Sequence, residues 1–292
     1  MQDQSEKIKQ DLRTIADILL LNGTLTECTG LVHGKMGIAV FFFHYARYTG
    51  NELFTDYSMY LIGELLNQIH INSNADYEKG IAGIGVGIDY LIQNNFLDVD
   101  EDICEDFDIR MVRAIRYEQW KDFSLYNGLT GYGRYWITRT RYKTPLIKAR
   151  KNLIYIIENI EEKLPEMSIF EQTDVYCFLH DLQGLSNIID IRIIDFLLDK
   201  FRKRWELHLL DINHSFLRLD NSEVGNIVRM IQQYRYFNCV CKDEINNTLT
   251  QISDLNMEQL PENTGLLNGY AGEGMIRLSA LEPSNTTWTN LL

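Results

Sequence analysis

The chain has 292 residues, of which 45% are hydrophobic and 11% aromatic, and its formal net charge is −13 at pH 7. This apolar content supplies a hydrophobic core and excludes general disorder. The negative charge argues against nucleic acid or an anionic membrane surface as a partner, because both select for basic patches. A cationic or neutral ligand fits better.

The N-terminal segment, MQDQSEKIKQDLRTIADILLLNG, begins with charged residues and has a helical pattern. It contains no signal-peptide hydrophobic region and no apolar stretch of about 20 residues. We therefore expect a cytoplasmic protein without an integral membrane segment. The five cysteines are an odd number, which argues against disulfides in a chain of this kind. They are Cys28, Cys104, Cys177, Cys239 and Cys241.

Six amphipathic helices are predicted along the chain, because charges mix with Leu and Ile at spacings of three and four. They cover residues 4–21, 53–71, 101–120, 145–164, 191–210 and 242–255. The third begins within DVDEDICEDFD, at 98–108, which lacks the central glycine and closing glutamate of a calcium-binding EF-hand loop. We interpret this acidic segment as a solvated helix start.

A glycine motif recurs between these helices and consists of a polar residue, Gly, two residues, Gly and an apolar run. Its copies are HGKMGIAVFFF, KGIAGIGVGID, NGLTGYGRYWI and NGYAGEGMIRL, with first glycines at Gly34, Gly80, Gly128 and Gly269. The steps between them are multiples of about 47, which predicts two further units.

The fifth and fourth units carry weaker forms of the motif. In NSEVGNIVRMI, Ser222 replaces the first glycine and Gly225 is the second. We place the start of the fourth unit near Gln172, in EQTDVYCFLHDL, because the alternative at Gly184 in QGLSNII gives uneven spacings.

The helices that follow the glycines are apolar nearly all round, which predicts that they are buried. Each of the six units then supplies an amphipathic outer helix and a buried inner helix. An open solenoid would expose inner helices that are too apolar to face water. We therefore predict one all-α domain over residues 1–292, an α/α toroid of about six helical hairpins with the glycine-rich starts of the inner helices at one mouth.

Four segments carry a resemblance to a known family: GLVHGKMGIAVFFF at 30–43, YEKGIAGIGVGIDYLI at 77–92, LYNGLTGYGRYWITR at 125–139 and TGLLNGYAGEGMIRL at 264–278. They resemble the lanthionine synthetase C-like family, whose members are α/α toroids with one glycine motif per hairpin. The resemblance implies a role in peptide modification, specifically the addition of a cysteine thiol to a dehydrated serine or threonine.

The catalytic members of that family bind zinc, which lowers the pKa of the substrate thiol. Their ligands come from late Trp-Cys-x-Gly and Cys-His-Gly motifs. Here Asp220, Asn221, Leu267 and Asn268 occupy the corresponding places. We therefore expect no evident cofactor, although the family implies zinc, and a protein that binds a peptide substrate or precursor peptide, alongside other peptide-biosynthesis proteins, rather than one that cyclises it.

The histidine of HGKMG is the candidate catalytic residue. His33 locally matches a His-Gly motif to which the family assigns proton transfer, although the family's histidine comes from a later unit. Imidazole titrates near neutral pH and suits a general acid or base. The alternative is a polar cap whose ring bonds to a nearby carbonyl group.

Polar residues at and beside the same motif position are candidates for substrate binding. They are Lys35, Lys79, Tyr126, Asn127, Asn221 and Asn268, with Gln183 as a further candidate if the fourth unit starts later. Helix N-capping is the alternative role for the three asparagines, since Asn is a favoured N-cap residue.

Two other functions remain open at this point. An active peptide cyclase with an atypical metal site could use Cys177 and His180, which are one helical turn apart, although core packing is the commoner role for such a pair. Cys239 and Cys241 are interpreted as buried, inert thiols. A carbohydrate-active toroid would need two carboxylates. The acids near inner-helix starts are Glu78, Asp89, Asp220, Glu223 and Glu273.

Overall fold

The computed structural model describes residues 2–99, 102–142, 144–208, 222–252, 255, 263–283 and 285–292. These residues form twelve α-helices and no β-strand, which confirms the all-helical prediction. The six amphipathic helices are α1 (Gln2–Asn22), α3 (Glu52–Gln68), α5 (Glu105–Tyr117), α7 (Leu146–Lys163), α9 (Ile191–His208) and α12 (Lys242–Thr250). The six motif helices, those that follow the motif positions, are α2 (Lys35–Thr49), α4 (Ile81–Gln93), α6 (Leu129–Arg139), α8 (Ile169–Leu182), α11 (Glu223–Gln232) and α13 (Tyr270–Leu281).

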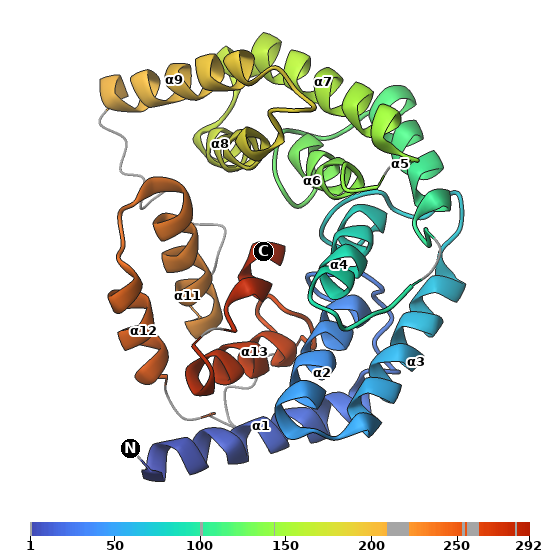
Figure 1. Cartoon of the computed structure of the whole chain (residues 1–292), viewed down its shortest axis with the longest axis vertical. Coiled ribbons are helices and arrows are strands. Elements are labelled where there is room, and N and C mark those ends of the chain that lie inside the picture. The colour runs from blue at the N-terminus through green and yellow to red at the C-terminus, as the bar shows by residue number, and fades with distance from the viewer. Residues whose placement is uncertain are drawn as a thin grey trace. The chain divides into compact units, whose positions relative to one another are not determined.

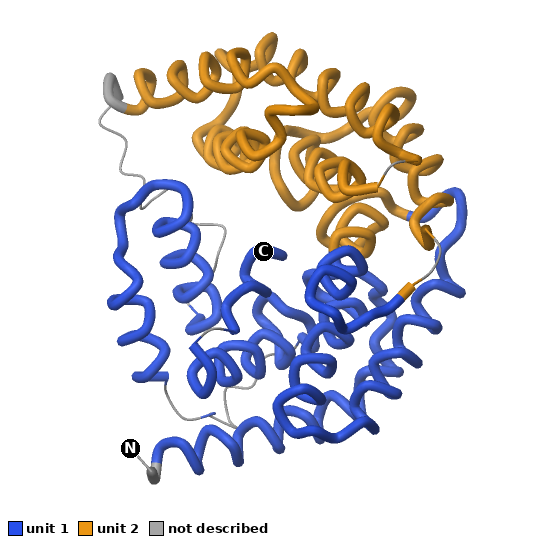
Figure 2. The backbone as a smooth tube through the Cα atoms, viewed as in Figure 1, with its two compact units in different colours: residues 1–73, 87–98, 219–292 blue, residues 74–86, 99–218 orange. Residues whose placement is uncertain are grey.

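The chain divides into two compact units, coloured separately in Figure 2. Unit 1 comprises residues 1–73, 87–98 and 219–292, and unit 2 comprises residues 74–86 and 99–218. Helix α4 contributes its first half to unit 2 and its second half to unit 1. The single-domain organisation stays a prediction.

In unit 1 the first helix of the chain packs against the last motif helix. Helix α1 lies along α13, which also contacts α2, while α2 pairs with α3 and α11 with α12 (Figure 1). The guanidinium of Arg277, 1% exposed, bonds to Asp11 of α1 at 3.2 Å and to Glu273 at 2.5 Å. A buried ion-pair network therefore joins residues near the two ends of the sequence.

In unit 2 helix α6 contacts α5, α7 and α8, and α8 pairs with α9. The acidic segment 98–108, which includes the first turn of α5, is not simply a solvated helix start, so that interpretation was wrong. Asp108 is 1% exposed and accepts hydrogen bonds from the Tyr135 hydroxyl at 2.6 Å and from Arg139 Nε at 2.8 Å. Burial opposes ionisation of Asp102, but the hydrogen bond and charge of Arg139 hold the pKa of Asp102 below its usual range.

The predicted burial of the motif helices is confirmed most fully in α2, where every residue from Lys35 to Ala46 is buried. His44 lies within this stretch, and its Nε2 is 2.8 Å from the Tyr90 hydroxyl, which is 3.1 Å from the Thr287 hydroxyl. Burial, followed by the charge of Arg47, lowers the pKa of His44 to about 3. The imidazole is therefore neutral near pH 7.

Helix starts follow the motif, except in the fourth unit. Gly34, Gly128 and Gly269 are the N-cap residues of their helices, and Ser222 caps α11 by accepting a hydrogen bond from Gly225 N. Helix α8 begins at Ile169, three residues before Gln172, so the fourth unit starts in the region that we predict and not at Gly184. A capping box fixes the helix start, in which the Ser168 side chain accepts from Glu171 N and the Glu171 carboxylate accepts from Ser168 N.

Candidate functional site

The four glycine motifs share one loop geometry. In each, the residue after the first glycine donates its backbone N–H to the carbonyl group six residues before that glycine. The bonds are Lys35 to Cys28 (2.9 Å), Ile81 to Asn74 (2.9 Å), Leu129 to Asp122 (2.9 Å) and Tyr270 to Asn263 (3.1 Å). The repeated sequence pattern therefore encodes a repeated loop, closed onto the start of its helix.

The first glycine of the motif is required by the close approach of the loop to itself. A Cβ atom at Gly34 would overlap the carbonyl oxygen of Cys28, and one at Gly80 would overlap that of Asn74. No side chain fits between these backbone segments.

Consecutive loops are joined by backbone hydrogen bonds, and in unit 2 these link the second motif to the third. The carbonyl oxygen of Tyr126 accepts from the N–H groups of Tyr77 and Glu78, at 3.0 and 3.1 Å. Helices α4 and α6 also meet at this place. The ring of Tyr135 on α6 packs against Gly85 on α4, in the space that a Cβ atom of residue 85 would take. We call this set of contacts the second-to-third junction.

In unit 1 the sixth motif is joined to the first in the same way. The carbonyl oxygen of Val32 accepts from the N–H groups of Leu266 and Leu267, at 2.8 and 3.1 Å. The ring of Phe41 on α2 packs against Gly274 on α13, at the motif positions that Tyr135 and Gly85 hold in unit 2. In this sixth-to-first junction, the sixth motif therefore contacts the first motif in the way that the second contacts the third.

The second-to-third junction gathers polar side chains from two loops. Asn127 Nδ2 donates to Glu78 Oε2 at 3.0 Å, and Lys79 Nζ lies 3.6 Å from Glu78 Oε1. Burial, followed by the charge of Asp174, raises the pKa of the neighbouring Tyr126, which therefore stays a neutral hydroxyl. Carboxylate, amide and ammonium groups thus meet at the starts of α4 and α6.

The sixth-to-first junction has a different lining. Leu267 stands at the position that Glu78 holds in unit 2, and His33 stands at the position of Asn127. The Asn268 backbone has a left-handed conformation, with φ of 55°, and its Oδ1 is buried without a hydrogen-bond donor among the described residues. Lys35, the first residue of α2, is 3% exposed.

Capping is not the role of the asparagines that the structure describes, so that alternative was wrong. The N-caps of α6 and α13 are Gly128 and Gly269, and neither helix start has a side-chain cap hydrogen bond. Asn127 reaches Glu78 instead. Asn221 and Asp220 lie outside the described residues. Gln183 follows the end of α8 and donates to Asp195 at 2.8 Å, away from any motif-helix start.

The third-to-fourth junction, also in unit 2, replaces the missing glycine loop with carboxylates of α8. Leu125 N donates to Asp174 Oδ2 at 2.8 Å, and Phe123 N donates to Glu171 Oε1 at 3.1 Å. The fourth unit therefore continues the chain of loop contacts through side-chain carboxylates in place of a backbone carbonyl group. The ring of Phe178 on α8 packs against Gly133 on α6, as at the other junctions.

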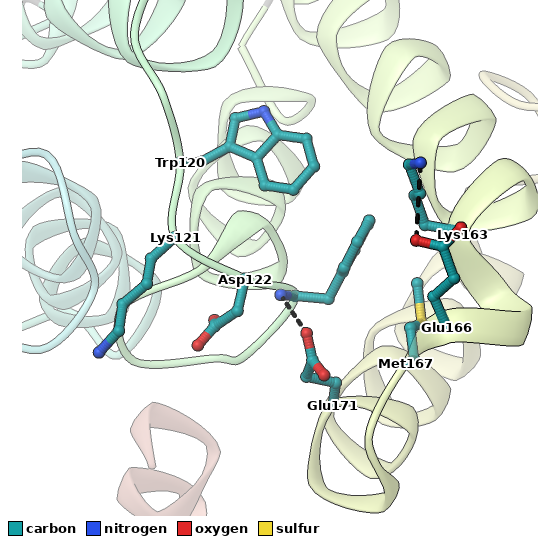
Figure 3. A pocket seen from close by; sticks show the side chains of 8 residues that line it. Trp120, Lys121, Asp122, Lys163, Glu166, Met167 and Glu171 are labelled. Carbon is teal, nitrogen blue, oxygen red and sulfur yellow. Dashed lines mark hydrogen bonds and ion pairs between the residues drawn. The ribbon is translucent and has the colours of Figure 1, made fainter.

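A pocket of about 200 Å³ lies at this third-to-fourth junction (Figure 3). It is lined by Trp120, Lys121, Asp122, Phe123, Lys163, Glu166, Met167 and Glu171. Sequence reasoning missed this pocket and both carboxylates of the junction. The capping-box pattern Ser-x-x-Glu at 168–171 was the available signal, because it locates the start of α8.

No family model, no curated protein and no solved structure matches this chain. Within the described residues, no helix is long and apolar enough to cross a membrane.

The cysteines differ from expectation in one respect. Cys239 and Cys241 are exposed, so their interpretation as buried thiols was wrong: they lie in the short link between η3 (Gln233–Phe237) and α12, where no helix covers them. Cys177 is buried within α8, one turn before the half-buried His180. Among the described residues, no three or more His, Cys, Asp or Glu side chains gather as a metal-binding group.

The remaining candidate carboxylates are divided between the units. Glu78 belongs to unit 2, where it bonds to Asn127, whereas Asp89, Glu223 and Glu273 belong to unit 1. Asp89 is 5% exposed, and Glu273 is paired with Arg277. At the pocket, Asp122 and Glu171 both accept hydrogen bonds from backbone N–H groups, so both carboxylates have a structural role.

Proposed function

We propose that this chain is a divergent lanthionine synthetase C-like protein, an α/α toroid that binds a peptide at the starts of its motif helices. The observation that carries the proposal is the equivalence of the two junctions. Contacts between the sixth and first motifs repeat those between the second and third, and α1 packs on α13. Adjacency of the last and first repeats is what closure of a ring requires.

The peptide-binding role rests on the polar side chains of the second-to-third junction. Glu78 supplies a hydrogen-bond acceptor, while Lys79 and Asn127 supply donors. Such a mixture suits the alternating N–H and C=O groups of a peptide backbone. The net charge of −13 favours a cationic peptide, because opposite charge speeds and strengthens encounter. A precursor peptide as partner and a cytoplasmic location belong to this proposal.

Binding without cyclisation is proposed because the donor set does not fit zinc. Leu267 and Asn268, at one of the family's ligand positions, bring neither thiolate nor imidazole, and Asn268 presents an amide. At the sixth-to-first junction, Leu267 takes the motif position that Glu78 holds at the second-to-third junction, so this position supplies no carboxylate.

The test is binding of three fluorescein-labelled peptides that differ only in net charge, each with one cysteine and one dehydroalanine. We expect saturable binding of the cationic peptide by fluorescence anisotropy, weakened about tenfold by Glu78→Gln. Glu161→Gln, a neutralisation on the exposed side of α7, is the matched control and leaves affinity unchanged. Absence of binding of all three peptides at about 0.1 mM protein overturns the proposal.

An active cyclase is distinguished in the same samples. Free thiol, measured by maleimide capture, is expected to disappear at the same rate with and without protein. Accelerated loss of thiol, together with near-stoichiometric zinc that is removed by the double variant Cys177→Ala/His180→Ala, would establish the atypical metal site and overturn the binding-only proposal.

A further inference from the structure

The pocket at the third-to-fourth junction lies where the repeat pattern changes. At the second-to-third junction, the next glycine loop packs on the preceding one. At the third-to-fourth junction, that loop is replaced by the side chains of Glu171 and Asp174. The pocket opens between the segment before α6 and the segment before α8 (Figure 3). It is next to the loop that carries Tyr126 and Asn127.

The pocket has aromatic and thioether walls. The indole of Trp120 meets the ring of Phe123 edge to face, with centroids 5.1 Å apart and planes at 66°. Figure 3 shows Trp120 on one side of the pocket and Met167 on the other. Aromatic rings favour a third ring in offset or edge contact, and methionine sulfur adds favourable contacts with ring edges. These walls select an apolar, flat occupant.

Four of the charged groups of the pocket have partners within the protein. Lys163 pairs with Glu166 at 3.6 Å, and Glu171 accepts hydrogen bonds from Phe123 N and from Ser168. Asp122 accepts from Ser124 N at 2.8 Å, and the side chain of Lys121 turns away in Figure 3. A cationic group that bound to Asp122 or Glu171 would compete with these hydrogen bonds, whereas an uncharged occupant leaves them in place.

We propose that this pocket binds one aromatic side chain of the peptide that the chain carries. The volume of about 200 Å³ matches a single large side chain and excludes a folded segment. The inference rests on the proposed function for its peptide, but the pocket's preference for an aromatic ring is testable without one.

The first experiment uses a single amino-acid mimic. N-acetyl-phenylalaninamide is titrated into the full-length protein, with N-acetyl-leucinamide, N-acetyl-lysinamide and glucose as comparisons. Trp120 is the half-buried tryptophan of the four, while Trp136, Trp205 and Trp288 are at most 8% exposed, so a change in tryptophan emission reports on the pocket. We expect saturation by the phenylalanine amide on the order of 1 mM, and affinity at least fivefold weaker for the others. Equal or tighter binding of the lysine amide or glucose overturns the proposal.

Variants then locate the binding by calorimetry. Trp120→Ala is expected to weaken binding of the phenylalanine amide by about tenfold or more, and Trp120→Phe, which keeps a ring, to weaken it by less. Tyr117→Ala removes an 82% exposed aromatic ring of the same unit and is the matched control. Far-UV circular dichroism establishes that each variant is folded. Unchanged affinity in both Trp120 variants contradicts the assignment.

A peptide-binding experiment distinguishes this inference from the proposed function. One position at a time in the cationic peptide is changed from Phe to Ala, and affinity for wild type and Trp120→Ala is compared. We expect one position at which Phe tightens binding in wild type only. Peptide binding that depends on Glu78 but shows no such position overturns the aromatic pocket alone. Amide binding without peptide binding overturns the proposed function alone.

Discussion

The sixth-to-first and second-to-third junctions have the same backbone but different side chains. Val32 and Tyr126 accept equivalent pairs of N–H groups, and Phe41 and Tyr135 pack against equivalent glycines. One junction then brings together Glu78 and Asn127, and the other Leu267 and His33. Backbone and glycine contacts therefore build the scaffold, while the side chains at two motif positions differ between the junctions, and only the second-to-third junction has a carboxylate at the position of Glu78.

The largest effect is expected from filling the equivalent second glycines of the two junctions. A Cβ at Gly131 would overlap the carbonyl oxygen of Leu125, and one at Gly37 that of Leu31. We expect Gly131→Ala and Gly37→Ala each to lower the free energy of unfolding by ~3 kcal/mol, measured by urea denaturation. Gly63→Ala, at a helix position open to solvent, should instead raise it by up to ~1 kcal/mol. If only one of the two Gly→Ala variants lost stability, the two junctions would not be equivalent.

Removing the ion pair between α1 and α13 should destabilise the part of the chain that contains the sixth-to-first junction. Asp11→Ala keeps the ion pair of the buried Arg277 with Glu273 but removes its ion pair with α1, which should lower the free energy of unfolding by ~2 to 3 kcal/mol. Asp17→Ala, at an exposed position of the same helix, should cost less than ~0.5 kcal/mol. Equal losses in the two variants would show that the network does not hold α1.

Helix α2 should make the free energy of unfolding depend on pH in a way that α6 does not. His44 of α2 occupies the motif position that Thr138 has in α6. Its pKa is lowered to about 3, so below pH 6.5 the unfolded chain takes up a proton that the folded chain does not. This contribution to stability is present above pH 6.5 and is lost as pH falls towards 3, by ~1.4 kcal/mol per unit.

The measurement is urea unfolding at pH 7.5 and pH 5. His44→Gln should reduce the pH dependence by ~2 kcal/mol over this interval. His70→Gln, at an exposed position, serves as the control. An unchanged pH dependence in His44→Gln would mean that the buried imidazole does not resist protonation.

The smallest effect concerns the polar contact itself. A double-mutant cycle with Glu78→Gln and Asn127→Leu should give a coupling energy of ~1 kcal/mol, since one partner of the hydrogen bond is charged and half-buried. A coupling below ~0.3 kcal/mol would mean that the polar character of this junction contributes nothing to its stability and is available entirely to a ligand.

The helices were predictable because their signals are local. Amphipathic spacing located the six amphipathic helices, and the recurring glycines located α2, α4, α6 and α13. The repeat spacing located α8 to within three residues, but it could not give the first residue of this helix, because Ser168 and Glu171 begin it with a capping box in place of a glycine. The burial of Asp108 was missed because its partner, Arg139, comes from another helix and no local pattern records that contact.

The candidate site was predictable only as a set of positions. The motif marked Lys79, Asn127 and His33 as equivalent, but it could not reveal that Glu78 reaches across to the next loop. Nor could it reveal the pocket, because the pocket forms between two segments that are 40 or more residues apart in the sequence and meet only in the folded chain. Helix capping by asparagine was a reasonable local prediction that the tertiary contact with Glu78 overrides.

The packing of α1 against α13 has a consequence for biosynthesis. The partners Asp11 and Arg277 are 266 positions apart, so α1 is synthesised long before the helix on which it packs. Unit 2, which ends at residue 218, has all its segments before then. Contacts of such long range form slowly. The apolar face of α1 therefore stays exposed on the nascent chain until α13 has been made, and it can promote aggregation during that interval.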